Sequence, residues 1–279
     1  MKGRAAWWGL IGLAFAGGLL LAGSGRGGAE ERTLVLTGSS TVAPLAAEVG
    51  KRFAALHPGV RVDVHTGGSS RGVADARRGL ADLGMASRAL RADEADLVAY
   101  PIARDGIALI AHASNPVRGL TREQVRAIYR GEARSWAAFG GPRTGRIVVV
   151  HKAAGHSTHD LFLAHFGLRE REVRADVVVG DNAQGIKAVA GNPLALGYVS
   201  IGAASTDAAR GVPLRLLALD GVAPTIEAVR SDRYPLERPL NLVARGPARG
   251  LAAAFVAYAR SEAVADLVTG LGFVPLTTQ

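Results

Sequence analysis

The chain has 279 residues, of which 48% are hydrophobic and 20% are charged, and it contains no cysteine. This length and apolar fraction suffice for one large domain or two ordinary ones with buried cores, and they exclude a disordered polymer. The lack of cysteine excludes disulfides, thiolate metal sites and cysteine nucleophiles. The net charge of +9 favours anionic partners without choosing among them.

Residues 1–29 have the pattern of a secretory signal peptide. Lys2 and Arg4 precede an apolar run from Ala5 to Ala22, and small residues continue to Ala29. A basic start, an apolar middle and small residues at the end are typical of segments removed after export. We expect a Sec-type signal that is cleaved, and a periplasmic or secreted protein. The alternative is an uncleaved membrane anchor, because the apolar run approaches ~20 residues.

After residue 32, short β-rich runs alternate with amphipathic segments. The run 33–37 predicts a strand, helical spacing of apolar residues predicts a helix over 42–56, and alternation over 60–64 predicts a second strand. This alternation, continued to the end of the chain, predicts an α/β fold. Further strands are predicted at 82–86, 107–111, 147–150, 177–179, 196–200 and 240–244, and further helices at 73–80, 121–129, 161–166, 184–190 and 251–267.

Two proline-containing segments look like crossings between domains. They are Ser114–Pro116 and Tyr234–Pro239. Two crossings make one domain discontinuous, so we expect lobe I to comprise 33–113 and 236–279 and lobe II to comprise 114–235. Each lobe is expected to hold a mixed sheet flanked by helices, with a cleft between the lobes.

Three turns place small and hydroxyl residues where a helix begins: 38–41, 67–72 and 155–158. The start of a helix exposes unpaired N–H groups and the positive end of the helix dipole, so such turns attract anions. If all three face one cleft, they would enclose a tetrahedral oxyanion. Ordinary N-capping is the alternative for any single turn, and Ser157 with Asp160 resembles a capping box. The candidate ligand residues in these turns are Ser39, Ser40, Thr41, Ser69, Ser70, Gly155, His156, Ser157 and Thr158.

Three cations lie in or near these turns and are candidates for neutralising a bound anion. Arg71 lies within the second turn, Arg88 follows Ser87 after the strand at 82–86, and Lys152 follows the strand at 147–150. Arginine suits bidentate contact with oxyanions, whereas lysine acts more as a point charge. The alternative for each is a solvated surface charge.

An enzymatic alternative arises in the second turn. Gly68–Gly72 fits Gly-x-Ser-x-Gly, so Ser70 is formally available as the nucleophile of a secreted hydrolase or phosphatase, with His151, His156 or His159 as a base. A nucleophile turn of this kind normally follows a strand deep within a sheet. Here only one predicted strand precedes the strand at 60–64 that leads into the turn. We expect no metal site, because no third ligand stands at a characteristic spacing from His156 and His159. Nucleic-acid binding is not expected, because the arginines are dispersed among acids.

The order of these motifs resembles that of the phosphate-binding proteins of ABC importers. The resemblance covers nearly the whole chain after residue 32. It is carried by the segments 36–44, 53–60, 67–72, 82–88, 120–136, 155–158, 192–198, 221–225 and 234–240.

This resemblance implies a two-lobed, type II-like periplasmic binding fold that closes on inorganic phosphate and delivers it to the transmembrane subunits of an ABC permease. It implies no enzyme activity, no cofactor and a monomer. By position, the binding residues of the family carry over to Ser40 or Thr41, Ser69, Ser87 or Arg88, and Ser157 with Thr158.

Two positions depart from well-known members of that family. Arg88 stands where they hold an acidic acceptor, and Lys152 stands where they hold an arginine. An acceptor matters because phosphate near neutral pH keeps a proton that sulfate lacks. Asp181 is a candidate acceptor, with a helix cap as its alternative. With Arg88 at this position, phosphate and sulfate are alternative ligands.

Overall fold

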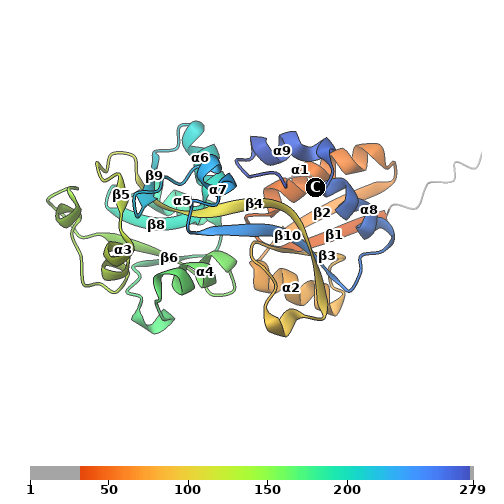
Figure 1. The fold of residues 1–279 in the computed structure, drawn as a ribbon, viewed down its shortest axis with the longest axis horizontal. Helices are drawn as coiled ribbons and strands as arrows, with labels where there is room; N and C mark the ends of the chain where they lie inside the picture. Colours follow the sequence, from red (N-terminus) through yellow and green to blue (C-terminus); the bar gives the residue numbers. More distant parts are fainter. Residues whose placement is uncertain (1–31, 277–279) are drawn as a thin grey trace, which may run out of the picture. The chain divides into compact units, whose positions relative to one another are not determined.

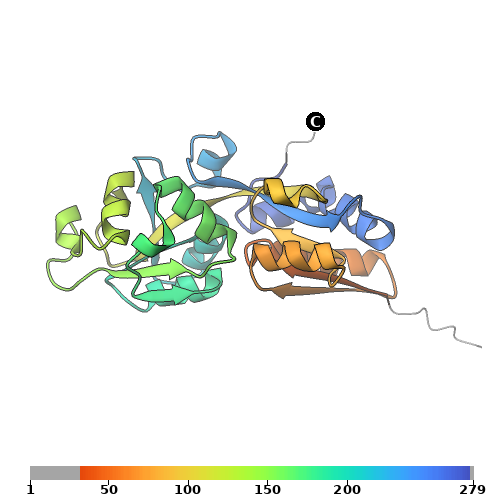
Figure 2. The same ribbon diagram turned by 90° about the horizontal axis from the view of Figure 1, so that it is seen from below.

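The structure is a computed structural model, and it describes residues 32–276. The predicted signal peptide lies outside these residues. Within them, strands and helices alternate from β1 to α9, which confirms the α/β class (Figures 1 and 2). Between residues 32 and 276, no helix has both the length and the apolar character needed to cross a membrane.

The first group of elements, which we call lobe I, surrounds a core that includes Phe53, Met85 and Phe255. Strand β1 pairs in parallel with β2 and β3, and β3 pairs in antiparallel with β10, so the sheet is mixed as expected. Its elements are β1 (Arg32–Gly38), α1 (Ala43–Leu56), β2 (Val60–Thr66), α2 (Ser69–Arg78), β3 (Leu83–Ala86), the 3-10 turn η1 (Ala92–Glu94), β10 (Glu237–Arg245), α8 (Gly250–Ala259), η4 (Glu262–Val264) and α9 (Ala265–Gly270).

The second group, lobe II, surrounds a core that includes Trp136, Phe162 and Tyr198. Strand β8 pairs in parallel with β6, and β6 pairs in parallel with β7. Parallel neighbours need crossover connections, and helices form part of these connections (Figure 1). Its elements are β5 (Gly119–Leu120), α3 (Arg122–Tyr129), η2 (Trp136–Phe139), β6 (Val148–Lys152), α4 (Ser157–Phe166), η3 (Glu170–Glu172), β7 (Val177–Val179), α5 (Asn182–Ala190), β8 (Ala195–Ser200), α6 (Ile201–Ala209), β9 (Leu214–Leu219) and α7 (Ile226–Arg230).

Strand β4 (Leu97–His112) joins the two lobes, and β10 runs antiparallel beside it (Figure 1). Ala103 belongs to the core of lobe I, whereas Ile107 belongs to that of lobe II. On β10, Leu240 belongs to the core of lobe I, and Leu236, just before this strand, belongs to the core of lobe II. We propose that the chain crosses between lobes in these two stretches; the boundaries expected from the sequence remain a prediction.

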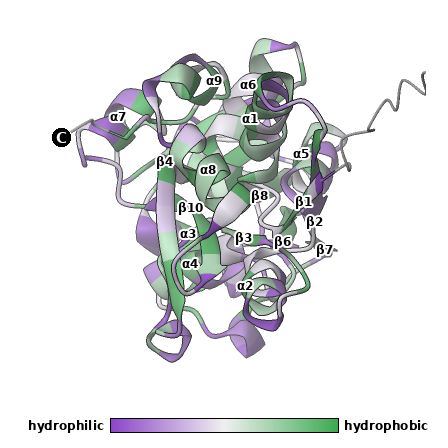
Figure 3. Ribbon diagram, turned by 90° about the vertical axis from the view of Figure 1, so that its right-hand side faces the viewer, coloured by the Kyte–Doolittle hydropathy of each residue, from purple (hydrophilic) through white to green (hydrophobic). Residues whose placement is uncertain are grey.

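The burial pattern follows the hydrophobic pattern of the sequence. Hydrophobic residues concentrate on the central strands and on the inward faces of the helices, whereas hydrophilic residues gather in the outer loops (Figure 3). Helix α1 illustrates the cause, since Leu45, Val49 and Phe53 recur at helical spacing and are buried.

Two expectations about elements were wrong in detail. The helix predicted over 251–267 is broken into α8, η4 and α9. At the break, the Ser261 hydroxyl donates to the Tyr258 carbonyl oxygen, and a side chain that bonds nearby backbone competes with continued helix. The strand predicted at 107–111 is part of the much longer β4, which passes Pro101 beside a β-bulge, where proline is tolerated within a sheet.

Candidate functional site: a buried arginine among hydroxyls

Four helix N-termini bring polar groups to the region between the lobes. Helices α1 and α2 belong to lobe I, and α4 and α5 belong to lobe II. Three of these were expected from the sequence; the fourth, that of α5, was recognised only as a capped turn. The Asp181 carboxylate accepts from the backbone N–H of Gln184, so Asp181 is the N-cap of α5, as its alternative interpretation held.

Arg238, on β10, lies at the centre of the cluster and is 2% exposed. Its Nη1 donates to the hydroxyl oxygens of Thr158 at 2.8 Å and Ser87 at 3.3 Å. Its Nη2 donates to the hydroxyl oxygen of Thr41 at 3.1 Å. One guanidinium therefore binds three hydroxyls that the chain places far apart, two from lobe I and one from lobe II.

Asp105, on β4, holds this arginine in place. Its Oδ2 accepts from Nε of Arg238 at 3.2 Å and from Nη2 at 2.9 Å, and its Oδ1 accepts from the backbone N–H of Gly202. Burial lowers the pKa of Arg238, and the charge of Asp105 and its hydrogen bond to Arg238 oppose that effect. Because Asp105 and Arg238 lie opposite each other on the paired strands β4 and β10, the backbone fixes the ion pair in place.

The hydroxyl oxygens accept hydrogen bonds from protein groups, which leaves their protons available for a bound anion. The Thr41 oxygen accepts from Arg238 and also from Asn182 Nδ2 at 3.1 Å. The Ser87 oxygen accepts from Arg238 and from the Ser39 hydroxyl at 3.0 Å. A hydroxyl that accepts from its neighbours still has its own proton to give. These groups can therefore donate to an anion while the guanidinium polarises them.

Ser39 and Ser69 hold the segments that carry these hydroxyls in position. The Ser39 oxygen accepts from the backbone N–H groups of Thr41 and Val42, in the turn that leads into α1. The Ser69 oxygen accepts from the backbone N–H of Ser87 at 3.2 Å and so ties α2 to the end of β3. Both residues are buried, and their hydroxyls position the neighbouring donors.

Lobe II contributes Lys152 and Ser157, which are each 2% exposed. The Lys152 ammonium donates to the Asp181 carbonyl oxygen. Burial lowers the pKa of Lys152 from 10.5 to about 7, with the Asp181 carboxylate opposing and Arg238 adding to the effect. Ser157 Oγ and Asn182 Oδ1 are buried without a hydrogen-bond partner among residues 32–276, so each can serve a bound group.

Four further candidates lie at the edge of the cluster, where the lobes meet. The backbone N–H of Ser70 donates to the Gly155 carbonyl oxygen at 3.1 Å. A Cβ at Gly68 would lie 2.7 Å from that oxygen, so the second turn needs glycine for this approach. Ser40, Ser70, Gly155 and His156 are all partly exposed. Burial lowers the pKa of His156, and Lys152 adds to the effect.

The two expected arginines do not join the three hydroxyls. Arg71 is exposed and pairs with Asp75 on the surface of α2, as its alternative interpretation held. Arg88 is 4% exposed, but its Nη1 and Nη2 donate to the two carboxylate oxygens of Glu94 at 2.6 and 2.7 Å. Of its guanidinium nitrogens, Nε is buried without a partner in the described structure.

The alternative interpretation of Ser157 and Asp160 as a capping box at the start of α4 was wrong. His156 is the N-cap residue, with no side-chain cap, and Ser157 is the first helical residue. Asp160 instead pairs with His159 and with Arg91 of lobe I.

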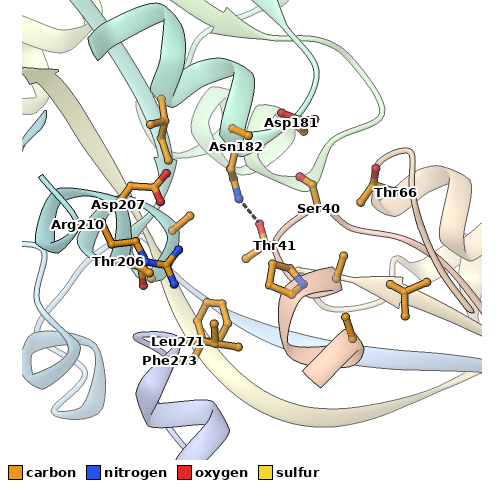
Figure 4. Close-up of a pocket in the computed structure, with 18 residues that line it drawn as sticks. Ser40, Thr41, Thr66, Asp181, Asn182, Thr206, Asp207, Arg210, Leu271 and Phe273 are labelled. Atoms are coloured by element: carbon orange, nitrogen blue, oxygen red, sulfur yellow. Dashed lines mark hydrogen bonds between the residues drawn. The ribbon is translucent and has the colours of Figure 1, made fainter. Parts of the chain in front are cut away.

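A groove of about 480 Å³ opens beside Thr41 and Asn182 (Figure 4). It runs between α1 of lobe I and α5 and α6 of lobe II. Apolar side chains, among them Ile186 and Phe273, form much of its wall, and Asp207 and Arg210 lie at one end. Thr41, which accepts from Arg238, lies in the wall of the groove beside Ser40.

Sequence reasoning missed Arg238, Asp105 and Asn182 as site residues. Arg238 entered the sequence analysis only as part of the segment 234–240. A charged residue between Leu236 and Leu240 in a strand nevertheless indicates a buried partner. Asp105 gives the same signal immediately before the apolar run 107–111. Which strands pair, and therefore that these two residues meet, was not readable from either run.

Comparison with known proteins finds relatives that match most of the chain. A family model described as PBP superfamily domain matches residues 24–263. A phosphate-binding protein PstS from Bacillus subtilis is 26% identical over 251 residues, covering 88% of this chain and 81% of that protein.

Two solved structures share the fold and most of the chain. One is a putative phosphate ABC transporter substrate-binding protein with bound phosphate from Clostridium perfringens, with a TM-score of 0.82, 30% identity, and coverage of 88% of this chain and 100% of that one. The other is an ABC-type phosphate transport receptor from Vibrio cholerae, with a TM-score of 0.71, 29% identity, and coverage of 87% and 100%. The match of the family model over most of the sequence places this chain in the PBP superfamily.

Proposed function

We propose that this protein captures inorganic phosphate between its lobes and delivers it to an ABC importer. The observation that carries the proposal is the buried Arg238 guanidinium bound to the hydroxyls of Thr41, Ser87 and Thr158. Together they offer positive charge and several donors to one small oxyanion. Hydrogen bonds to charged groups each contribute ~1.5–3 kcal/mol net.

Contacts from both lobes supply the physical basis of capture. Thr158 belongs to α4 of lobe II, whereas Thr41 and Ser87 belong to lobe I. A ligand that binds groups on both lobes favours the conformation in which the lobes meet. The proposed ligand residues are therefore the three hydroxyls, Arg238, Lys152 and the Ser157 hydroxyl. The start of α5 adds Asn182, whose unpartnered Oδ1 is a neutral acceptor for the proton that phosphate retains.

The protein is a binding protein and not an enzyme, in keeping with relatives that include phosphate-binding proteins and a transport receptor. The hydrolase alternative built on Ser70 is therefore not pursued. The role belongs outside the cytoplasm, as in binding proteins of this kind. We propose that residues 1–29 direct export and are then removed, and that the protein acts as a monomer that docks on the transmembrane subunits of a permease.

Calorimetric titration of the purified chain with phosphate, sulfate, arsenate and molybdate tests this proposal. We expect saturable binding of one phosphate, with sulfate weaker. Thr158→Val should weaken phosphate binding by roughly tenfold or more, because a donor to a charged ligand is lost. Thr206→Val, in the groove beside the site, is the matched control and should leave the affinity unchanged.

Two results would overturn the proposal. One is a chain that binds none of the four oxyanions. The other is turnover of p-nitrophenyl phosphate or of a p-nitrophenyl ester that Ser70→Ala abolishes.

A further inference from the structure

A second cluster of side chains in lobe II takes no part in the buried-arginine cluster. It consists of His151 at the end of β6, His159 on α4 and Glu170 at the start of η3. Nε2 of His151 lies 3.2 Å from Glu170 Oε2, and Nε2 of His159 lies 2.6 Å from the same oxygen. One ligand atom from each residue lies within 4.8 Å of the other two.

Both imidazoles are held by a partner on their other nitrogen. Nδ1 of His159 lies 2.8 Å from Asp160 Oδ1, and Nδ1 of His151 lies 2.8 Å from the Tyr198 hydroxyl. When Nδ1 carries the proton and donates it to these oxygens, the ring is oriented and Nε2 is left to bind a metal, an arrangement that accompanies most metal-binding histidines. Here both Nε2 atoms point toward the same carboxylate.

The surroundings fix these side chains in position. The side chains of His151 and His159 are 2% and 7% exposed, whereas that of Glu170 is 62% exposed. The Tyr198 ring stacks on Phe162 with centroids 3.7 Å apart and an angle of 9° between the planes. Asp160 is held in turn by Arg91 of lobe I. Little movement is therefore needed to assemble a site, and the exposed glutamate leaves one side open to water.

The donor set identifies the class of ion. Two imidazole nitrogens and one carboxylate oxygen suit zinc and similar divalent transition metals, whereas magnesium and calcium prefer oxygen ligands. Bond lengths of about 2.0–2.2 Å in a tetrahedral site place neighbouring ligand atoms roughly 3.3 Å apart. The observed separation of 3.2 Å already fits, and that of 2.6 Å needs an expansion by less than an ångström.

We propose that His151, His159 and Glu170 bind one zinc ion, with water in the fourth position. This proposal departs from the expectation of no metal site, which considered only His156 and His159. The third ligand is a glutamate 11 residues after His159 and 19 after His151, and His156 takes no part. In the absence of metal, the same two atoms of His159 and Glu170 are joined by a hydrogen bond, which zinc would replace. The proposal stands independently of phosphate capture.

The test uses the full chain, stripped of metal with a chelator and kept in phosphate-free buffer. Zinc chloride is titrated in a calorimeter and against a chromophoric chelator. We expect one saturable site, with no comparable heat from magnesium chloride. Glu170→Gln and His159→Gln should each weaken zinc binding by more than the ~10–100-fold typical of outer-shell changes, and Asp160→Asn should weaken it within that range.

The exposed His65 on β2 provides the matched control, because His65→Gln removes a histidine far from the cluster along the chain. That variant should bind zinc like the parent. Glu170→Gln alters an exposed side chain, so it tests the site even if His159→Gln fails to fold. The proposal fails if the parent shows no saturable zinc binding, or if Glu170→Gln retains the parent's affinity.

Discussion

Two buried arginines, Arg238 and Arg88, lie close to the three hydroxyls, yet the structure uses them differently. Both are almost fully buried and both pair with an acid. Glu94 binds both Nη atoms of Arg88 with its two carboxylate oxygens. Asp105 binds Arg238 through a single oxygen, and the remaining donors reach Thr41, Ser87 and Thr158.

The difference teaches that burial and positive charge do not by themselves mark a ligand arginine. What decides is which hydrogen bonds the paired acid leaves free. Arg88 is largely satisfied by its own lobe, so we infer that it mainly fixes the segment that carries Ser87. Arg238 receives support from β4 and shares its donors between lobes, so we infer that it is the charge to which an anion responds. Substitutions at each arginine test this contrast.

The largest effect is expected for Arg238→Gln. Truncating one partner of a buried, hydrogen-bonded charge pair costs ~2–5 kcal/mol, which predicts phosphate binding weaker by roughly 30-fold or more. Calorimetric titration measures this loss. Arg238→Lys keeps the charge and should recover part of the affinity. Wild-type affinity in the glutamine variant would remove Arg238 from the site.

A smaller effect, and on a different quantity, is expected for Arg88→Lys. The lysine keeps the charge but loses one of the two bonds to the Glu94 carboxylate, so the free energy of unfolding should fall by ~1.5–3 kcal/mol. Urea denaturation measures this change. Phosphate affinity should stay within a few-fold of the parent's. A large loss of affinity in a well-folded variant would show that the two arginines act alike.

Glu94→Gln tests the same pair through pH. Burial alone would raise the pKa of the Glu94 carboxyl, but hydrogen bonds from Arg88 and from the Arg91 backbone hold it below its ordinary value of 4.5. A depressed pKa contributes stability above the unfolded-state pKa, and this stability is lost as the pH falls through the folded-state pKa. The free energy of unfolding of the parent should therefore exceed that of the variant by about 1–2 kcal/mol at neutral pH.

The difference in unfolding free energy between parent and variant should become smaller as the pH falls below 4.5. Urea denaturation at a series of pH values measures it. Glu227→Gln, at an exposed glutamate of α7, is the matched control and should show almost no gap at any pH. A gap at Glu94 that stayed constant down to acid pH would mean that its charge contributes nothing.

The smallest effect is expected for Arg71→Ala. Arg71 forms an exposed ion pair with Asp75 on α2, and such pairs contribute ~0–1 kcal/mol. Both stability and phosphate affinity should remain close to those of the parent in denaturation and calorimetry. A marked loss of phosphate binding would place this surface cation in the site after all.

Much of the local structure was readable from the chain. The helix over 42–56 and the strand over 60–64 follow from the spacing of apolar residues, which reports the period of each element directly. Hydroxyl residues at helix starts were recognisable because such starts need small polar groups. These features depend on residues that are neighbours in the sequence, so they can be predicted from the sequence alone.

The sequence by itself determined the alternation of elements, the turns rich in serine and threonine, and the excess of positive charge. Only the tertiary structure decided which cation meets those turns and which is held by an acid. Arg238 and Asp105 stand 133 residues apart, and they meet because β4 and β10 pair where the chain crosses between lobes. The same holds for His151, His159 and Glu170. Contacts of this kind follow from packing and strand pairing, which the spacing of residues along the chain does not encode.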